Sequence, residues 1–345
     1  MRRVRTPAPV LAALLAACSA APARVAWSWR LLPDTGSRAS LRGLSALSAE
    51  VCWVAGAQGT VLLTRDGGRT WQRVGPPGSE ALDFRSVRAF DADTAWIANA
   101  GAPARILRTE DGGAHWTLVH EDARPAAFFD SLAAWDRRRG LVLGDPIERR
   151  FTLLQTRDGG RTWQADPAGA LPEAASGEAA FAASNSCIAV HGAEAAWLVT
   201  GGTQARVLFS ADAGAHWQQA PLPLAQGIAS AGAFGVAFRD AARGVIVGGD
   251  YARERESTGT AAWTADGGRT WLPAQPGPDG YRSDVAWLSG AGTSCIAVGP
   301  TGTSLSPDGG RTWQEVSAEG FHAVEVAAGG AVWACGGGGR IGVRK

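Results

Sequence analysis

The chain has 345 residues, of which 46% are hydrophobic and 19% charged, and it includes 46 glycines and 15 tryptophans. This profile is typical of a turn-rich globular protein with enough apolar residues for a large core. The formal net charge is +1 and Lys345 is the only lysine, so no basic excess supports nucleic-acid binding.

Residues 1–18 have the features of a lipoprotein export signal. Arg2, Arg3 and Arg5 precede an apolar run at 10–17 that is too short to span a bilayer. Residues 15–18, Leu-Ala-Ala-Cys, resemble a lipobox, which predicts lipidation of Cys18 and a tether at 19–26. The alternative is ordinary cleavage near residues 19–21. The lipoprotein interpretation predicts a periplasmic protein anchored to the outer membrane by lipid alone.

One eight-residue pattern, [Ser/Thr]-x-Asp-x-Gly-x-[Thr/His]-Trp, occurs six times between residues 64 and 313. Its aspartates are 42 to 54 residues apart, which is the period of a β-propeller blade. They are Asp66, Asp111, Asp158, Asp212, Asp266 and Asp308. The pattern is the Asp-box of the bacterial neuraminidase repeat.

Each Asp-box predicts the turn of a β-hairpin on the outer rim of a blade. The aspartate can accept backbone hydrogen bonds within the turn, and the glycines supply positive φ angles. The tryptophan at the end of each box predicts an apolar contact between neighbouring repeats. Each aspartate stands alone at its turn, which favours a structural role over metal binding.

The segments between the boxes divide into seven units. Seven opening strands are expected at 41–44, 84–87, 129–132, 181–184, 234–237, 281–284 and 321–324, and seven second strands at 52–56, 95–99, 141–144, 197–201, 245–248, 295–299 and 332–336. The seventh unit lacks a fourth strand, and residues 27–33 resemble the missing strand. We therefore predict an all-β, seven-bladed propeller at 27–345, with its last blade closed by the N-terminal strand.

Four cysteines remain after the export signal: Cys52, Cys187, Cys295 and Cys335. An exported protein can form disulfides, and Cys335 would lie in a blade next to those of Cys52 and Cys295. The sequence allows a bridge from Cys335 to either neighbour, but it favours buried free thiols.

Charged and aromatic residues follow the openings of several blades and the ends of second strands. In a propeller these positions surround one mouth of the central channel, where arginines suit carboxylates or phosphates. The predicted ligand-binding residues are Arg42, Arg85, Asp130, Asp145, Glu178, Asp250, Tyr251, Arg282 and His322. The alternative is that these charges pair with one another. No metal or cofactor motif is found.

A glycosidase of sialidase type is the alternative function. Sialidases carry Asp-boxes, an arginine triad and a tyrosine nucleophile. Arg42, Arg85 and Arg282 could form the triad, with Tyr251 or Tyr281, Glu178 and Asp130 as catalytic residues. Sialidases resemble six-bladed rings, however, and their early Arg-Ile-Pro motif is absent. The sequence therefore favours a binding protein over an enzyme.

From residue 27 to 345 the chain resembles the photosystem II stability/assembly factor family and its non-photosynthetic bacterial relatives. The resemblance rests on the Asp-boxes with their tryptophans, on second strands such as Trp-Val-Ala-Gly at 53–56, and on the split last blade. It implies a seven-bladed scaffold that binds a partner protein through an arginine-rich surface. We expect a monomeric, lipid-anchored scaffold that recognises a protein or an anionic ligand at the channel mouth.

Overall fold

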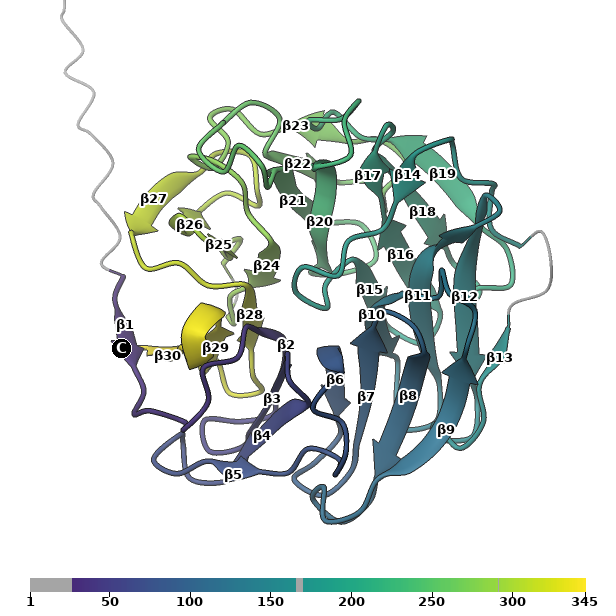
Figure 1. The fold of residues 1–345 in the computed structure, drawn as a ribbon. Coiled ribbons are helices and arrows are strands. Elements are labelled where there is room, and N and C mark those ends of the chain that lie inside the picture. The colour runs from purple at the N-terminus through teal and green to yellow at the C-terminus, as the bar shows by residue number, and fades with distance from the viewer. Residues whose placement is uncertain (1–26, 166–169, 291) are drawn as a thin grey trace, which may run out of the picture.

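The computed structural model describes residues 27–165, 170–290 and 292–345. The described residues form seven antiparallel sheets around a central axis, as Figure 1 shows. The predicted seven-bladed propeller is therefore confirmed. The predicted export signal, Cys18 and the tether at 19–26 lie outside the described residues, so these assignments stay predictions.

The first three blades are regular four-stranded sheets in which consecutive strands pair. Blade 1 comprises β2 (Leu41–Ala46), β3 (Cys52–Gly56), β4 (Thr60–Thr64) and β5 (Gln72–Arg73). Blade 2 comprises β6 (Asp83–Ala89), β7 (Ala95–Ala100), β8 (Ala104–Thr109) and β9 (Thr117–Asp122). Blade 3 comprises β10 (Phe129–Ala134), β11 (Gly140–Ile147), β12 (Arg150–Thr156) and β13 (Gln164–Ala165).

Blades 4 to 6 follow the same plan with one addition. Blade 4 has β15 (Ile188–His191), β16 (Ala195–Val199), β18 (Arg206–Ser210) and β19 (Gln218–Pro221). Blade 5 has β20 (Ala231–Phe238), β21 (Gly244–Asp250), β22 (Ala261–Thr264) and β23 (Leu272–Pro273), extended by β14 (Glu178–Ala179) and β17 (Gly201–Gly202). Blade 6 has β24 (Asp284–Trp287), β25 (Cys295–Gly299), β26 (Gly302–Ser306) and β27 (Gln314–Ser317).

Blade 7 combines both ends of the described chain. Strands β28 (Ala323–Val326), β29 (Val332–Cys335) and β30 (Ile341–Arg344) are followed in space by β1 (Trp29–Leu31), which pairs antiparallel with β30. A short 3₁₀ turn, η1 (Gly337–Gly339), lies between β29 and β30. The predicted closure of the last blade by the N-terminal strand is confirmed, and the sheet edge of β30 is covered.

The opening strand predicted at 181–184 is wrong. The inner strand of blade 4 is β15, which begins seven residues later at Ile188. The predicted openings at 281–284 and 321–324 also begin too early, because β24 starts at Asp284 and β28 at Ala323. These three differences matter for the site, since they change which side chains point into the channel.

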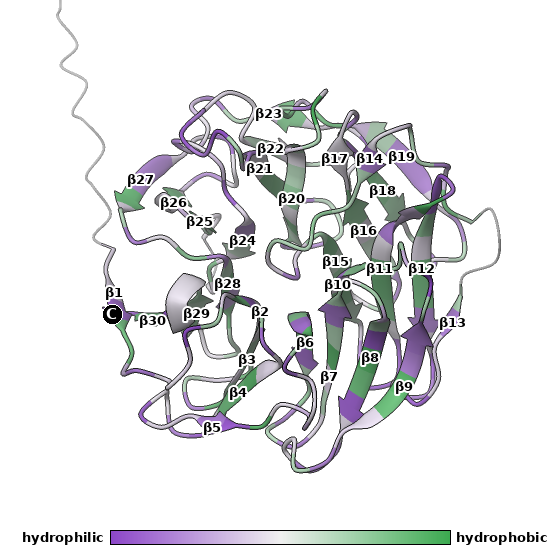
Figure 2. Cartoon of the chain, in the orientation of Figure 1, coloured by the Kyte–Doolittle hydropathy of each residue, from purple (hydrophilic) through white to green (hydrophobic). Residues whose placement is uncertain are grey.

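The core lies between the blades. Strands near the axis are largely buried, and the outermost strands, such as β5 and β19, are mostly exposed and hydrophilic (Figure 2). Asp-box tryptophans pack on tryptophans of the preceding blade: Trp116 on Trp53 at 6.3 Å between ring centroids, and Trp163 on Trp96 at 5.4 Å. The tryptophan at the end of the box therefore joins neighbouring blades, as expected.

The Asp-box turns are held by side-chain hydrogen bonds. In the first box, Asp66 Oδ1 accepts the Thr70 N–H at 2.9 Å and Oδ2 accepts the Thr70 hydroxyl at 2.7 Å. The Thr64 hydroxyl accepts the N–H of Gly68 at 2.9 Å. The two bonds from Thr70 are the main cause that lowers the pKa of Asp66 to about 2. Both oxygens of the Asp66 carboxylate accept hydrogen bonds within their own turn, which fits a structural role.

The four cysteines of the described residues are all free and buried. The bridge from Cys335 to a neighbouring blade, which the sequence allowed, is therefore not formed. Burial raises the pKa of each thiol.

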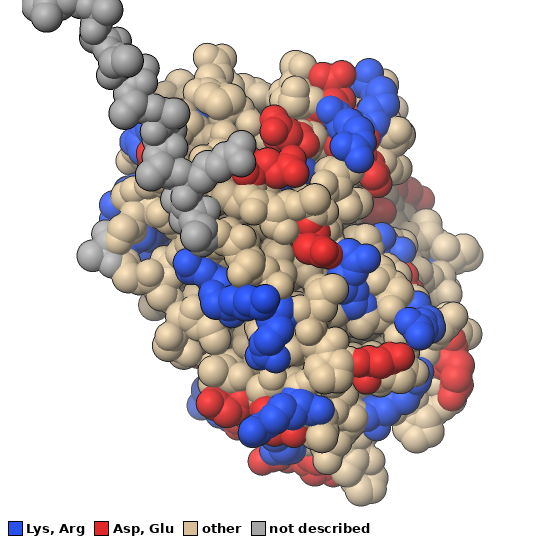
Figure 3. Space-filling view, turned by 90° about the vertical axis from the view of Figure 1, so that its left-hand side faces the viewer, with Lys and Arg blue, Asp and Glu red and all other residues tan. Residues whose placement is uncertain are grey.

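The side of the ring that carries β1 and the C-terminus shows acidic and basic side chains together (Figure 3).

The closing strand is the element on which we expect the ring to depend most. Trp29 is 8% exposed, its indole N–H donates to Thr303 Oγ1 at 3.0 Å, and its ring lies 5.0 Å from that of Phe321. We expect Trp29→Ala to lower the free energy of unfolding by about 3–5 kcal/mol, as for other buried aromatic truncations.

Leu31, on the same strand and 49% exposed, is the matched control. Leu31→Ala should change the unfolding free energy by no more than about 0.5 kcal/mol. Chemical denaturation of both variants measures the difference, and equal losses would contradict the closure role of Trp29.

Candidate functional site

Residues 180–187, which we call the hub plug, lie across the middle of the ring instead of forming a strand (Figure 1). Their hydrogen-bond partners come from six different blades. These partners are Arg42 of blade 1, Arg85 and Val87 of blade 2, Ser131, Leu132 and Asp145 of blade 3, Val199 of blade 4, Val236 of blade 5 and Ser283 of blade 6. The hub plug therefore fastens the inner strands to one another.

Asn185 makes the contacts in the middle of the hub plug. Its side-chain oxygen accepts the Leu132 N–H at 2.9 Å, and its side-chain nitrogen donates to the Val87 carbonyl at 3.2 Å. Asn185 has a φ of 70°, a left-handed conformation that asparagine tolerates better than most residues. One side chain thus links the inner strands of blades 2 and 3.

The hub plug separates two cavities. One, of about 480 Å³, is lined by Arg42, Arg85 and His322 at the start of the inner strands, and we call it the mouth. The other, of about 470 Å³, lies along later residues of the same strands, such as Leu44, Val87 and Val324. Hub plug residues line both cavities. The hub plug therefore lies between the two cavities, with residues 180–183 lining the mouth and residues 184–186 lining the other cavity.

The basic side of the mouth is formed by two neighbouring arginines. Arg42 donates through Nη1 to the carbonyl of Ala183 at 3.0 Å, and Arg85 through Nη1 to the carbonyl of Ala182 at 3.3 Å. Arg85 also forms an ion pair with Asp83 at 2.7 Å. Among the described residues, Arg42 has no carboxylate partner within ion-pair distance. Burial, and then the charge of Arg85, lower the pKa of Arg42.

His322 lies on the same side of the mouth. Burial, followed by the charges of Arg42 and Arg85, lowers the pKa of His322 to about 4. The imidazole is therefore neutral at neutral pH. It offers a hydrogen-bond donor and an acceptor without adding charge.

The acidic side of the mouth is formed by Asp130 and Asp145. Asp130 is fully buried, and neither carboxyl oxygen has a hydrogen-bond partner of regular geometry among the described residues. Burial, and then the proximity of Asp145, raise the pKa of Asp130 well above its usual value. Asp145 is half-buried and accepts the Ala180 N–H at 3.1 Å, and burial raises its pKa to about 6.

Aromatic rings form the rest of the wall. Phe181 of the hub plug stacks on Phe234 with centroids 4.0 Å apart, and Tyr281 meets Phe234 edge-on at 4.7 Å. Tyr251 is 47% exposed and lies 6.3 Å from Phe181. The mouth therefore combines charged groups of both signs with an apolar surface, as ligand cavities commonly do.

Six of the nine predicted ligand-binding residues line the mouth: Arg42, Arg85, Asp130, Asp145, Tyr251 and His322. The other three lie outside its lining. Glu178 is buried in a two-bond ion pair with Arg206, at 2.7 and 2.8 Å. Asp250 pairs with Arg253 at 2.7 Å.

Arg282 is the third predicted residue outside the mouth. It is fully buried and donates to the Tyr281 carbonyl at 3.0 Å, to Thr301 Oγ1 at 3.1 Å and to Ser304 Oγ at 2.9 Å. The structure therefore does not bring together the arginine triad of the glycosidase alternative. Nor does it place Glu178 among the residues that line the mouth beside Tyr251 and Asp130.

Sequence reasoning missed the contribution of the hub plug itself. Phe181 and the carbonyls of Ala182 and Ala183 shape the mouth, although the sequence placed them on a strand. Glu254, in the charged insertion between β21 and β22, also lines the mouth. A signal was present in Asn185, because an asparagine is an unusual residue for the inner strand of a blade.

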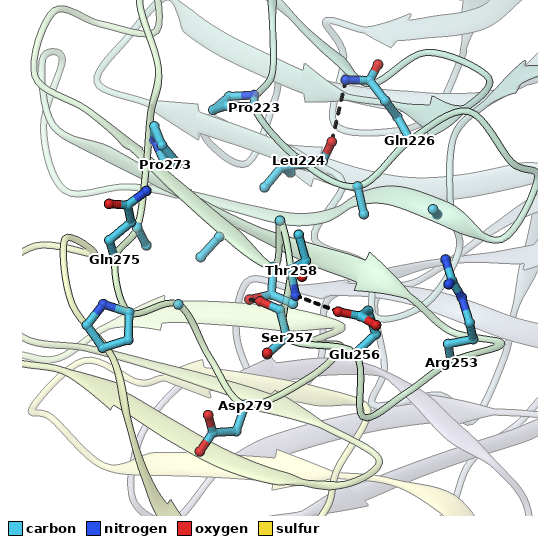
Figure 4. Close-up of a pocket in the computed structure, with 18 of the residues that line it drawn as sticks. Pro223, Leu224, Gln226, Arg253, Glu256, Ser257, Thr258, Pro273, Gln275 and Asp279 are labelled. Carbon is cyan, nitrogen blue, oxygen red and sulfur yellow. Dashed lines mark hydrogen bonds between the residues drawn. The ribbon is translucent and has the colours of Figure 1, made fainter.

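A larger groove of about 890 Å³ lies away from the mouth, between segments 223–228, 253–261 and 273–279. Figure 4 shows Gln226, Arg253, Glu256 and Asp279 around it, and these side chains are exposed. Thr258 donates its N–H to Glu256 within the groove wall at 3.3 Å. The groove is more open and holds no buried polar group without a partner, so the mouth is the stronger candidate.

The described residues contain no group of three or more histidine, cysteine or acidic side chains placed to hold a metal ion. In the same part of the chain, no helix has the length and apolar character needed to cross a membrane.

Residues 24–128 match the family model described as photosynthesis system II assembly factor YCF48. This match confirms the predicted family resemblance over that part of the chain. No curated protein matches the chain.

Solved structures show where the same fold occurs. A structure described as YCF48 bound to D1 peptide has a TM-score of 0.64 at 19% identity, covering 92% of this chain and 94% of that one. YCF48 from Cyanidioschyzon merolae has a TM-score of 0.59 at 18% identity, covering 92% and 98%. Virginiamycin B lyase from Staphylococcus aureus has a TM-score of 0.63 at 12% identity, covering 92% and 99%. At these identities the likeness shows the fold alone.

The raised pKa of Asp145 makes a prediction about stability. Its pKa is about 6 in the folded chain, against about 3.9 in an unfolded one. The folded state binds more protons between these values, so the stability that this group contributes is present below about pH 4 and is lost by about pH 6.

Asp145→Asn should remove this loss of stability with rising pH. Relative to the parent protein, the variant should become more stable between about pH 4 and pH 7, as measured by urea unfolding. Asp34→Asn, at an exposed aspartate of the β1–β2 loop, is the control. Parallel pH profiles for the parent and Asp145→Asn would contradict burial of this carboxyl.

Proposed function

We propose that the chain is a binding or assembly-scaffold protein whose mouth receives an anionic segment of a partner protein. The ligand's carboxylate is held by Arg42 and Arg85, and its apolar part packs on the rings of Phe181, Phe234 and Tyr251. The rigid propeller positions these groups without needing to move.

The observation that carries this proposal is the environment of the Arg42 guanidinium. Arg42 is half-buried, lines a cavity and lacks a carboxylate partner within ion-pair distance among the described residues. An unpaired cation with reduced solvation is costly, and an incoming carboxylate removes that cost with charge-assisted hydrogen bonds. The neighbouring Arg85 adds positive charge at the same place, which increases the attraction for an anion.

The comparisons support a protein segment as the ligand. A similar propeller, YCF48, has been solved with a D1 peptide bound. The peptide bound by the present chain need not resemble the D1 peptide. The aromatic wall of the mouth favours a peptide that carries an apolar side chain beside the acidic group.

The location of the protein is the second part of the proposal. The sequence of residues 1–18 supports export and lipidation at Cys18, and β1 begins at Trp29, close to the end of the proposed tether. A scaffold on a short lipid tether would meet partners at the periplasmic surface of the outer membrane.

Arg42→Ala should weaken binding of acidic peptides about tenfold or more, because hydrogen bonds between charged groups contribute about 1.5–3 kcal/mol. The probe is an array of short synthetic peptides in which aspartate or glutamate alternates with its amide counterpart. Fluorescence anisotropy gives the dissociation constants, and Arg42→Lys should retain part of the affinity.

Arg38→Ala is the control, because Arg38 is exposed and pairs only with Asp34 in the described structure. Thermal unfolding checks that each variant is folded. The proposal fails if acidic peptides bind no better than their amides, or if Arg42→Ala binds them as the parent protein does.

Cys18→Ala should abolish lipidation while the propeller still folds. Metabolic labelling with radioactive palmitate in a bacterial host should mark the parent protein and leave the variant unlabelled. Equal labelling of both proteins, or none of the parent, would rule out the lipoprotein assignment and leave the binding proposal untouched.

A further inference from the structure

The acidic side of the mouth has no role in holding an anion. Asp130 lies among the residues that line the mouth and is fully buried. Neither of its carboxyl oxygens has a hydrogen-bond partner of regular geometry among the described residues. The N–H of Ala182 is near enough to act on the Asp130 carboxyl but too poorly aligned for a regular hydrogen bond. Buried polar groups nearly always find well-formed partners, so this carboxyl can take a further partner from outside the chain.

Asp145 is the more accessible member of this pair. It is half-buried, and its Oδ1 accepts the Ala180 N–H at 3.1 Å. In the described structure its Oδ2 accepts no hydrogen bond. Asp145 lies close enough to Asp130 to disfavour a charge on the Asp130 carboxyl.

The basic side of the mouth does not neutralise the acidic side. Arg85 uses its Nε for Asp83 and its Nη1 for the hub plug carbonyl of Ala182. No ion pair joins Asp130 or Asp145 to an arginine among the described residues. Asp145 and the two arginines therefore face one cavity without an ion pair across it, and a ligand with one sign of charge would satisfy only one side of the mouth.

We propose that the ligand is bipolar: a peptide segment in which a lysine or arginine side chain lies close to a carboxylate. The basic group binds Asp145, with Asp130 behind it, while the carboxylate binds Arg42 and Arg85. This assignment rests on the proposed function, and it adds the cationic half of the recognised motif.

Four acetylated and amidated peptides test this motif. All share a phenylalanine and a fluorescent label, one position is aspartate or asparagine, and a neighbouring position is lysine or norleucine. The peptide with both charges should bind the full chain about tenfold tighter than the peptide with aspartate alone, because the added bonds join charged groups.

The variants separate the two halves of the mouth. In Asp145→Asn, and in the isosteric Asp130→Asn, the ratio of the two affinities should fall to about one. In Arg42→Ala both peptides should weaken, and the ratio should stay near its original value. Thermal unfolding of each variant checks that it is folded, and Asp34→Asn is a surface control.

The outcomes are distinguishable from those of the proposed function. Equal affinity of the parent protein for the two aspartate peptides would overturn the bipolar motif and leave anion binding intact. A ratio that persists in both Asp145→Asn and Asp130→Asn would also overturn it. No binding by any peptide would overturn the motif together with the proposed function.

Discussion

The hub plug is the constraint on which the site depends. Its backbone groups lie in the middle of the ring, where few water molecules can satisfy them, so they must find partners on the surrounding strands. Contacts from Arg42, Arg85, Ser131 and Val236 supply those partners. The same contacts fix the guanidinium groups at the floor of the mouth. Without the hub plug the two arginines would lose the carbonyls that orient them.

The mouth differs from the Asp-box turns and the Glu178–Arg206 pair in how fully its charged side chains are partnered. The Asp-box carboxylates accept several hydrogen bonds within their own turns, and Glu178 is paired with Arg206. At the mouth, Arg42 lacks a counterion and Asp130 lacks hydrogen bonds of regular geometry, within the described structure. Such local inconsistencies are expected at functional sites, where binding requires groups that the fold itself leaves unsatisfied.

The large-scale architecture could be predicted from the sequence because it repeats. Six Asp-boxes at blade spacing determine the number and direction of the strands, and the tryptophans at 27 and 29 identify the strand that closes the ring. These features depend on local turn chemistry and on strand patterning. Both are visible in a short window of sequence.

The details of the site could not be predicted in the same way. Phe181 resembles the aromatic openings of other blades, but its ring stacks on Phe234 while the strand begins later at Ile188. Arg282 follows Tyr281 as Arg42 follows Leu41, so the two arginines look equivalent in sequence. Arg282 nevertheless lies before β24, and its side chain donates to Thr301 and Ser304.

A shift of two or three residues decides whether a side chain enters the channel, and only the packing of the whole ring sets that shift. The pairing of Glu178 with Arg206 likewise joins segments 28 residues apart and has no local signature.

The titration of His322 tests the central claim, which is that the hub plug holds Arg42 and Arg85 beside His322 in a partly buried cavity. NMR of the imidazole should give a pKa of about 4, because burial and the charges of Arg42 and Arg85 disfavour the protonated ring. In Arg42→Gln the pKa should rise toward its ordinary value. A pKa near 6.5 in the parent protein would mean that the ring is solvated or that the arginines are neutralised by carboxylates, and it would contradict the account.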